Sequence, residues 1–252
     1  MIRKILPIAI CAAFAAGSVH ATGFTNGGFE DGDLGGWNQG GGSWFGTPAL
    51  PVPASNYAGG PSNNTLMTAG TDPISGANTV YNGNYSVRVN DRSNDYSVST
   101  IDQSVTNYTD TDIYFQWNAV LEASHGLTDS DYFSLTLHDD TTGTDVLTRS
   151  YSSASAPGVF INLNNGWYSS GWQLEHIDLT TAGAGGTSLV GNDFTLTLLA
   201  SDCPYGGHAG YTYLDGFAPI IVPPGAPEPG SLALLGLGLA GLAVSRRRNS
   251  AA

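Results

Sequence analysis

Apolar and polar residues alternate in several short runs through the middle of the chain. This period of two is typical of β-strands with one buried face, because successive side chains of a strand point to opposite sides. Clusters of Gly, Asn, Asp, Ser and Pro separate the runs, and no window of about ten residues shows a helical period. The alternating apolar positions are Tyr85, Val87 and Val89; Ile113, Phe115 and Trp117; Phe133, Leu135 and Leu137; Phe194, Leu196 and Leu198; and Tyr211 and Tyr213.

The pattern predicts one all-β domain over residues 22–222, built as an antiparallel two-sheet sandwich. Roughly 200 residues is a length that such sandwiches commonly occupy as a single domain. Two stretches, Trp37 to Thr79 and Thr141 to Gly171, show few strand patterns, and the first contains Gly40-Gly41-Gly42. We expect long loops in both stretches. Because loops of that length are usually functional or mobile, we expect a binding site there.

The first 21 residues have the three parts of a secretory signal peptide. Arg3 and Lys4 supply a positive start, residues 5–16 an apolar core, and Ala21 the end of a small-x-small cleavage site. The mature chain is therefore predicted to begin at Thr22, outside the inner membrane.

The C-terminal end predicts a membrane anchor in three parts. A Pro-rich spacer covers residues 223–229, a short transmembrane helix covers 230–245, and a basic tail covers 246–252. The helix is marginal, since the uncharged, Leu-, Ala- and Gly-rich residues 230–244 rise only about 22 Å against a hydrocarbon core of roughly 30 Å. Positive charge beside a span is retained in the cytoplasm, which places the domain outside. The spacer ends with Pro227, Glu228 and Pro229, and the basic tail begins with Arg246, Arg247 and Arg248.

This order of parts over residues 226–248 resembles the PEP-CTERM sorting signal of Gram-negative bacteria. Two positions depart from the usual pattern, because Gly230 replaces the commoner Ser and Ala226 the commoner Val. The resemblance implies that an exosortase-type membrane protease removes the tail. The protein would then be membrane-anchored only transiently before reaching the cell surface or the extracellular space, in an organism that makes extracellular polysaccharide. It implies no activity, and an ordinary C-terminal anchor is the alternative.

The charge balance of the domain excludes one class of partner. Between Thr22 and Ala226 there are three arginines and 20 carboxylates, the 21 of the chain less Glu228, so the net charge is −17. Nucleic acid is therefore not expected as a partner. An acidic surface rich in Gly, Ser, Thr and Asn stays soluble and suits divalent cations or neutral sugars better than anionic polymers.

Cysteine and histidine positions predict no transition-metal site. His125, His138, His176 and His208 are scattered and match neither HExxH nor a Cys-His zinc spacing. Cys203 is the only thiol after the signal peptide, so no internal disulfide is expected, and the sequence leaves open whether it is buried or forms an intermolecular bridge.

Two short motifs resemble the galactose-binding-like jelly rolls, a superfamily that contains many carbohydrate-binding modules. Asn26-Gly27-Gly28-Phe29-Glu30 followed by Gly36-Trp37 is similar to its opening, and residues 213–217 to its closing strand. The resemblance implies that the first and last strands lie side by side, and that Glu30 and Asp215 share a structural calcium. Asp31 and Asp33 are further candidate ligands, but nothing in the pattern selects either of them. The alternative is that Glu30 caps a turn and Asp215 hydrogen-bonds a neighbouring strand. Residues 202–208 resemble a recurring feature of exported bacterial sandwiches without assigned chemistry.

Loop aromatics are the candidates for sugar binding, with core packing as the competing interpretation, which we favour for Trp117. No motif selects a pair of carboxylates for glycoside hydrolysis; Asp139 and Asp140 suit a turn, and Glu122 and Glu175 are unplaced. The candidate sugar-binding residues are Trp44, Tyr57, Trp167 and Trp172, with Phe45 and Tyr168 beside them.

Together these features favour an exported, non-catalytic surface or extracellular-matrix protein that associates with exopolysaccharide, as in a biofilm. Two alternatives stay open, a polysaccharide-acting hydrolase and a structural or adhesive protein that binds other proteins.

Overall fold

The computed structural model describes residues 23–46, 50, 53–126, 129–155 and 158–218. The signal peptide, the Pro-rich spacer, the transmembrane helix and the basic tail predicted above all lie outside these residues. Within them the only helices are three short 3-10 turns, η1 (Ala54–Tyr57), η2 (Ser153–Ser155) and η3 (Ala184–Gly186). None of the helices in this part of the chain has the length and apolarity needed to cross a membrane.

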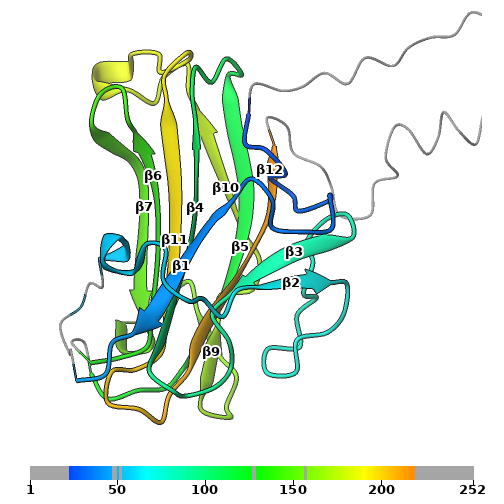
Figure 1. Cartoon of the computed structure of the whole chain (residues 1–252), viewed down its shortest axis with the longest axis vertical. Coiled ribbons are helices and arrows are strands. Elements are labelled where there is room, and N and C mark those ends of the chain that lie inside the picture. The colour runs from blue at the N-terminus through cyan, green and yellow to red at the C-terminus, as the bar shows by residue number, and fades with distance from the viewer. Residues whose placement is uncertain (1–22, 47–49, 51–52, 127–128, 156–157, 219–252) are drawn as a thin grey trace, which may run out of the picture.

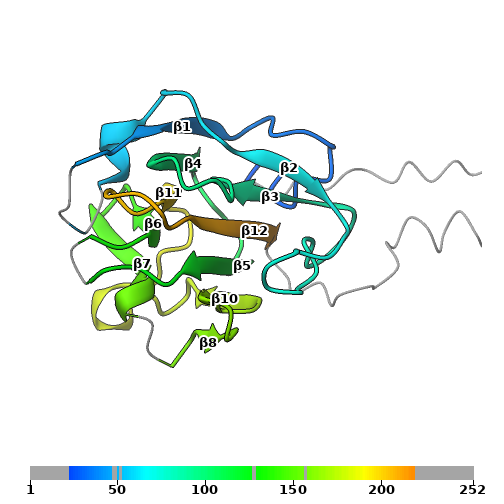
Figure 2. The ribbon, with the colours of Figure 1, turned by 90° about the horizontal axis from the view of Figure 1, so that it is seen from below.

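Two antiparallel sheets pack face to face, as the end-on view of Figure 2 shows. The five-stranded sheet has the order β1 (Asn38–Ser43), β4 (Ser97–Val105), β11 (Phe194–Ser201), β6 (Tyr132–Asp139) and β7 (Thr144–Ser152). The seven-stranded sheet has the order β2 (Thr65–Thr68), β3 (Tyr85–Val89), β12 (Gly210–Ala218), β5 (Asp112–Glu122), β9 (Trp167–Ser169) and β8 (Ile161–Asn162), and β10 (Gln173–Asp178) also pairs with β5.

The chain passes repeatedly from one sheet to the other. β1 lies in the first sheet, β2 and β3 in the second, β4 in the first, β5 in the second, β6 and β7 in the first, β8 to β10 in the second, β11 in the first and β12 in the second. This is the connectivity of a jelly-roll sandwich (Figure 1). The prediction of an all-β, antiparallel two-sheet fold is confirmed.

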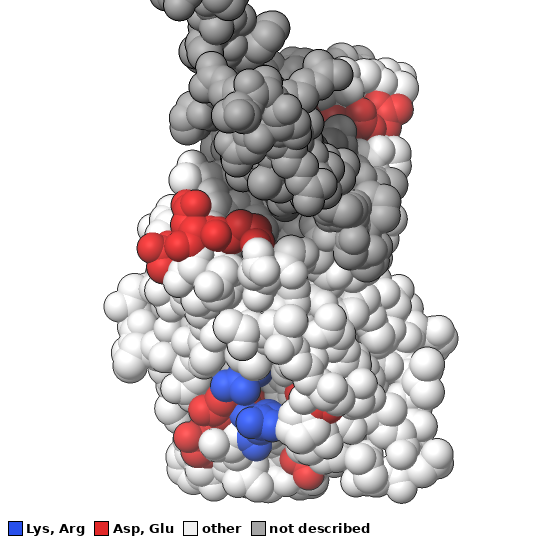
Figure 3. Space-filling view, turned by 90° about the vertical axis from the view of Figure 1, so that its right-hand side faces the viewer, with Lys and Arg blue, Asp and Glu red and all other residues white. Residues whose placement is uncertain are grey.

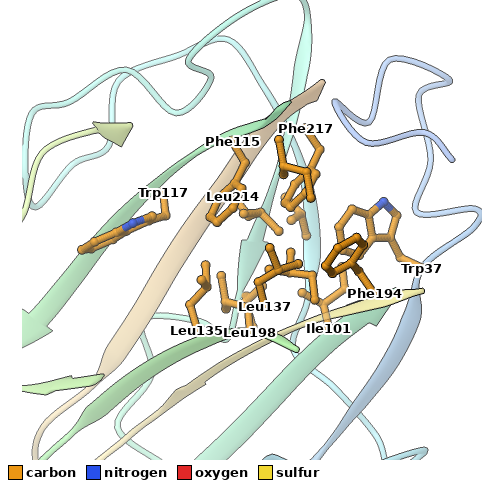
Figure 4. Close-up of a cluster of buried hydrophobic side chains, with 14 of the residues drawn as sticks. Trp37, Ile101, Phe115, Trp117, Leu135, Leu137, Phe194, Leu198, Leu214 and Phe217 are labelled. Atoms are coloured by element: carbon orange, nitrogen blue, oxygen red, sulfur yellow. The ribbon is translucent and has the colours of Figure 1, made fainter. Parts of the chain in front are cut away.

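The core lies between the sheets and contains most of the apolar positions whose alternation predicted the strands (Figure 4). Tyr211 and Tyr213 are exceptions, because they belong to a separate buried cluster. Trp117 stacks on Phe133 with ring centroids 4.8 Å apart, and Phe115 stacks on Phe217 at 4.5 Å. Leu135, Leu137, Leu196 and Leu198 belong to the same cluster and are fully buried. Burying a Leu or Phe side chain stabilises a fold by about 1.5–3 kcal/mol, so this layer holds the two sheets together.

The first predicted long loop is wrong, because the glycine run forms strand β1. Gly40 pairs with Thr100 of β4 across the sheet. A Cβ atom at Gly40 would lie 2.2 Å from the carbonyl oxygen of Tyr57, and one at Gly41 would lie 2.4 Å from that of Pro61. Residues 57–61 therefore lie directly on the strand, and only glycine leaves room for them.

The second predicted long loop is wrong as well. Residues 141–171 contain β7, which pairs with β6 along its length with a bulge between Leu137 and His138, and also β8 and β9. β7 is the edge strand of its sheet, and most of its side chains are exposed or half-buried. An edge strand that buries little shows no clear alternation, which is why the pattern missed it.

The opening motif lies beside the closing strand but is not itself a strand. Residues 24–36 form a series of turns, and the Phe217 N–H of β12 donates to the Gly27 carbonyl at 3.4 Å. A Cβ atom at Gly27 would lie 2.6 Å from Phe217. The first strand, β1, pairs with β4 in the other sheet. The expectation that the first and last strands pair is therefore corrected, although the two motifs meet.

The close approach of residues 57–61 to β1 gives a direct test. We expect Gly41→Ala to lower the free energy of unfolding by about 1–3 kcal/mol, because its Cβ atom overlaps backbone carbonyls that cannot move without shifting the segment. Gly42→Ala is the matched control, since its Cβ atom would lie 3.4 Å from the Tyr57 ring, and it should change stability by no more than about 0.5 kcal/mol. Urea denaturation measures both. Equal stability of the two variants would contradict this packing.

Candidate functional site

Glu30 and Asp215, the predicted calcium ligands, hold the same loop from two sides. The loop precedes β3. Asp215 accepts the backbone N–H groups of Tyr81 and Asn82 on one carboxylate oxygen, at 2.7 and 3.0 Å. Glu30 accepts the backbone N–H groups of Asn84 and Tyr85, both at 2.9 Å. The opening turn, this loop and the closing strand therefore meet at one point.

One carboxylate oxygen where these three segments meet has no hydrogen-bond partner. Asp215 is fully buried, and its Oδ1 atom accepts no hydrogen bond. Burial raises the pKa of Asp215 to about 7 against hydrogen bonds that lower it, and the nearby charge of Glu30 raises it further. Two close carboxylates with one buried, unpaired oxygen form an electronegative site whose all-oxygen donors fit a hard cation such as Ca²⁺. Asp33 instead accepts the N–H of Gly35, so it shapes the opening turn.

Trp44 and Tyr57 belong to the outer face of the five-stranded sheet. Trp44 is only 3% exposed, packs with Val98 and Tyr132, and donates its indole N–H to the Asp202 carbonyl at 2.8 Å. Tyr57 is half-buried against the same cluster. The burial of Trp44 leaves no ring face for a sugar, and we therefore correct its assignment from sugar platform to core residue.

Trp167 and Trp172 lie together on the outer face of the seven-stranded sheet, and both are half-buried. The Trp167 ring lies 6.1 Å from that of Tyr211, and the Trp172 ring lies 6.1 Å from that of Tyr213. Tyr211 and Tyr213 are alternate residues of β12, so the sheet itself sets the spacing of the two indoles. Trp172 also donates its indole N–H to the Asn78 carbonyl at 2.9 Å.

A buried carboxylate, which the sequence did not single out, fixes the two tyrosines. Asp72 is fully buried and accepts hydrogen bonds from the hydroxyls of Tyr211 and Tyr213, at 2.9 and 2.7 Å, and from the N–H and hydroxyl of Ser75. Burial alone would raise the pKa of Asp72, but these hydrogen bonds lower it below its ordinary value. Asp72 is therefore ionised, and it ties residues 72–75 to the outer face of the sheet. The only sequence clue was Asp72-Pro73, a typical turn start.

The carboxylates considered for hydrolysis have structural partners. Glu175 accepts the Trp117 indole N–H at 2.9 Å and pairs with both ends of the Arg149 guanidinium at 2.8 and 2.7 Å. Glu122 accepts the N–H of Ala209. Asp139 accepts the N–H groups of Thr141 and Thr142, as a turn former does. A surface cleft between the β6–β7 turn and residues 182–189 is lined by small aliphatic, threonine and glycine residues and one aspartate, Asp145, without an aromatic ring.

Three residues that the spacing did not connect meet in space. His125, Cys203 and His208 each present a potential metal ligand, and the three ligand atoms lie within 4.8 Å of one another. Histidine and cysteine spacing along the chain did not connect these residues, because they come from two separate loops that only the fold brings together. His138 and His176 lie elsewhere, paired with Asp145 and Asp112.

Comparison with known proteins identifies the C-terminal tail. Residues 226–248 match the PEP-CTERM protein-sorting motif, which marks an exported protein that is sorted to the cell surface. The motif covers a small part of the chain. No curated protein matches the sequence.

Several solved structures with a similar fold are carbohydrate-binding modules. TmCBM61, solved with β-1,4-galactotriose, is 12% identical; the match covers 77% of this chain and 95% of that one, with a TM-score of 0.41. The module CBM27-1 of Caldicellulosiruptor saccharolyticus, solved with mannohexaose, is 10% identical over 78% and 97%, with a TM-score of 0.38. The K2 adhesin domain of Lys-gingipain is 14% identical over 75% and 93%, with a TM-score of 0.35. TM-scores below 0.5 do not assign this chain to any of these protein families.

Proposed function

We propose that the domain is a non-catalytic carbohydrate-binding module, exported and associated with extracellular polysaccharide through the outer face of its seven-stranded sheet. The observation that carries this proposal is the pair of half-buried indoles, Trp167 and Trp172, on one face of the sheet. The flat C–H face of a pyranose ring packs on an aromatic face, and a platform of two rings contacts more than one sugar unit.

The platform is rigid before a ligand arrives. Tyr211 and Tyr213 lie under the two indoles, and Asp72 fixes both hydroxyls. A preorganised site loses little side-chain entropy on binding, which favours affinity from a small contact area. The sequence pattern did not predict these hydrogen bonds, because Asp72 is 139 residues from Tyr211 and 141 residues from Tyr213 along the chain.

The surface suits a neutral polymer. The domain has three arginines and no lysine between Thr22 and Ala226, which disfavours capture of anionic chains. Figure 3 shows one side of the body on which most of the described surface is neither acidic nor basic. Hydroxyl-rich ligands are recognised by amides, hydroxyls and aromatic rings, and these groups dominate the composition of the domain. A hydrolase is disfavoured because Glu175, Glu122 and Asp139 are engaged in structural contacts.

We further propose that Glu30 and Asp215 hold a structural calcium. Its support is the unpaired, buried Oδ1 atom of Asp215 and the like charge of Glu30 beside it. A bound divalent cation would neutralise both carboxylates and fix the opening turn to the closing strand.

For the C-terminal tail we propose processing by an exosortase-type protease, so that the membrane anchor is transient. The support is the motif match over residues 226–248. Mass spectrometry of the mature protein from its native host tests this, and we expect a C-terminus upstream of Gly230. A mature chain that retains Arg246 to Arg248 would contradict processing.

Substitution of the indoles tests the sugar platform. We expect Trp167→Ala and Trp172→Ala each to weaken binding of a neutral polysaccharide at least tenfold, about 1.4 kcal/mol, because each removes one stacking surface. Isothermal calorimetry against the producer's own polysaccharide and a glycan array measures the affinity. Phe45→Ala is the matched control, since Phe45 is 68% exposed but packs on Tyr96 instead of on this face.

Three results would contradict the proposal. Unchanged affinity in both tryptophan variants would exclude this face. Absence of glycan binding, together with recovery of a specific protein partner, would favour the adhesive alternative. Release of new reducing ends from the polysaccharide would favour the hydrolase.

Chelation tests the calcium proposal. We expect a calcium chelator to lower the melting temperature of the purified protein, because a ligand present at 100 times its Kd stabilises the folded state by about 2.7 kcal/mol. Asp215→Asn and Glu30→Gln should both abolish the response to added calcium. Asp145→Asn, an exposed carboxylate paired with His138, is the control and should keep it. A melting temperature that chelator leaves unchanged would sink the proposal.

A further inference from the structure

The connection between β11 and β12 folds into a closed turn that brings Cys203 and His208 together. The Cys203 N–H donates to the His208 carbonyl at 3.0 Å, and the Gly206 N–H donates to the Cys203 carbonyl at 3.1 Å. Gly206 and Gly207 have φ values of +82° and +86°, which favour glycine. A side chain at Gly206 would also meet the Tyr96 ring at 2.7 Å. These contacts and φ values restrict the turn to one backbone conformation.

A second segment brings His125 to the same place. β5 ends at Glu122, whose N–H donates to the Ala209 carbonyl at 3.0 Å while its carboxylate accepts the Ala209 N–H at 2.9 Å. This reciprocal pair joins the end of β5 to the start of β12. His125 follows three residues later, with its Nδ1 atom 3.2 Å from the Cys203 sulfur. Its ring centroid lies 4.7 Å from that of His208, at an interplanar angle of 86°.

The separations are close to those of a bound ion. A tetrahedral zinc with Zn–S near 2.3 Å and Zn–N near 2.0–2.1 Å holds its ligand atoms about 3.4–3.6 Å apart. The three ligand atoms here lie within 4.8 Å of one another, and the sulfur to Nδ1 distance is already 3.2 Å. Binding an ion would require the widest separation, at most 4.8 Å, to close to about 3.5 Å.

The donor atoms select the metal. One thiolate and two imidazoles form a borderline-soft set that prefers zinc or copper, whereas calcium and magnesium require oxygen ligands. The calcium proposed above therefore does not compete for this cluster. Glu30 and Asp215 lie at the opposite end of the sandwich, where β12 ends, and the β11–β12 turn lies at its lower end (Figure 1).

Burial excludes reaction of this cysteine with a substrate and an intermolecular disulfide. The Cys203 side chain is 0% exposed, so neither a substrate nor a second protein chain reaches its sulfur. His125 is exposed, and a single ion can enter from that side. The thiol now donates to the Asp129 carbonyl at 3.0 Å. On metal binding this proton is released to solvent, and the sulfur–metal bond replaces the hydrogen bond.

We propose that His125, Cys203 and His208 form a binding site for one zinc ion, with a fourth position open toward solvent on the His125 side. The ion joins the loop after β5 to the turn before β12 in a domain whose single thiol allows no internal disulfide. Because its three donor residues belong neither to the sugar platform nor to the proposed calcium site, this proposal can be tested independently of the proposed function.

Cobalt substitution tests the site. The full-length protein is stripped with chelator under reducing conditions and titrated with Co²⁺, and zinc content is measured separately by mass spectrometry. We expect about one zinc per chain and, with Co²⁺, a thiolate-to-metal charge-transfer band. Cys203→Ser should abolish the band, and His125→Ala and His208→Ala should each weaken metal binding at least tenfold.

Two matched controls separate this site from surface histidines and from the proposed calcium site. His138→Ala and His176→Ala, which remove histidines paired with surface carboxylates, should bind metal as the parent does. Asp215→Asn should also keep its zinc. His125 is exposed, so its variant keeps the test valid if Cys203→Ser fails to fold. Absence of the charge-transfer band in the parent, or a band and affinity unchanged in His125→Ala, would overturn the proposal.

Discussion

The pairing of β12 with β5 is the interaction on which the other features of the domain depend. β12 starts beside Cys203 and His208, carries Tyr211 and Tyr213 on its outer side, and places Asp215 near its end. Its inner side contributes Leu214 and Phe217 to the core. Because β5 continues past the start of β12, its end brings His125 to the same turn. One strand therefore positions the histidine–cysteine cluster, the two tyrosines beside the indoles and the carboxylate of Asp215.

Buried, hydrogen-bonded polar groups fix the loops of this domain, as disulfides do in many exported proteins. Asp202 is fully buried, where burial raises its pKa to about 7, yet it accepts hydrogen bonds from the Ser97 N–H and the Asn90 amide. Asp72 has the corresponding role on the outer face of the seven-stranded sheet. An isolated buried carboxylate is costly, and several hydrogen bonds offset that cost while fixing one arrangement of the loops.

The sequence predicted the strands whose inner faces are apolar and whose outer faces are polar, because burial on one side produces alternation. It missed β1, whose glycines are required by a segment lying on top of it, and β7, which lies at an edge and buries little. Glu30 and Asp215 meet on one loop, although a bound calcium stays a prediction. The contact of His125 with Cys203 was unpredictable, because a separation of 78 residues is closed only by the strand pairing.

The direction of β12 also determines at which end of the strand the C-terminal tail is attached. The strand ends at Ala218, and the sorting motif begins only a few residues later, at residue 226. The tail therefore follows the end of β12 that lies beyond Asp215, whereas Cys203 and His208 precede the start of the strand. The proposed processing within the motif would thus remove none of the residues that form the two sheets.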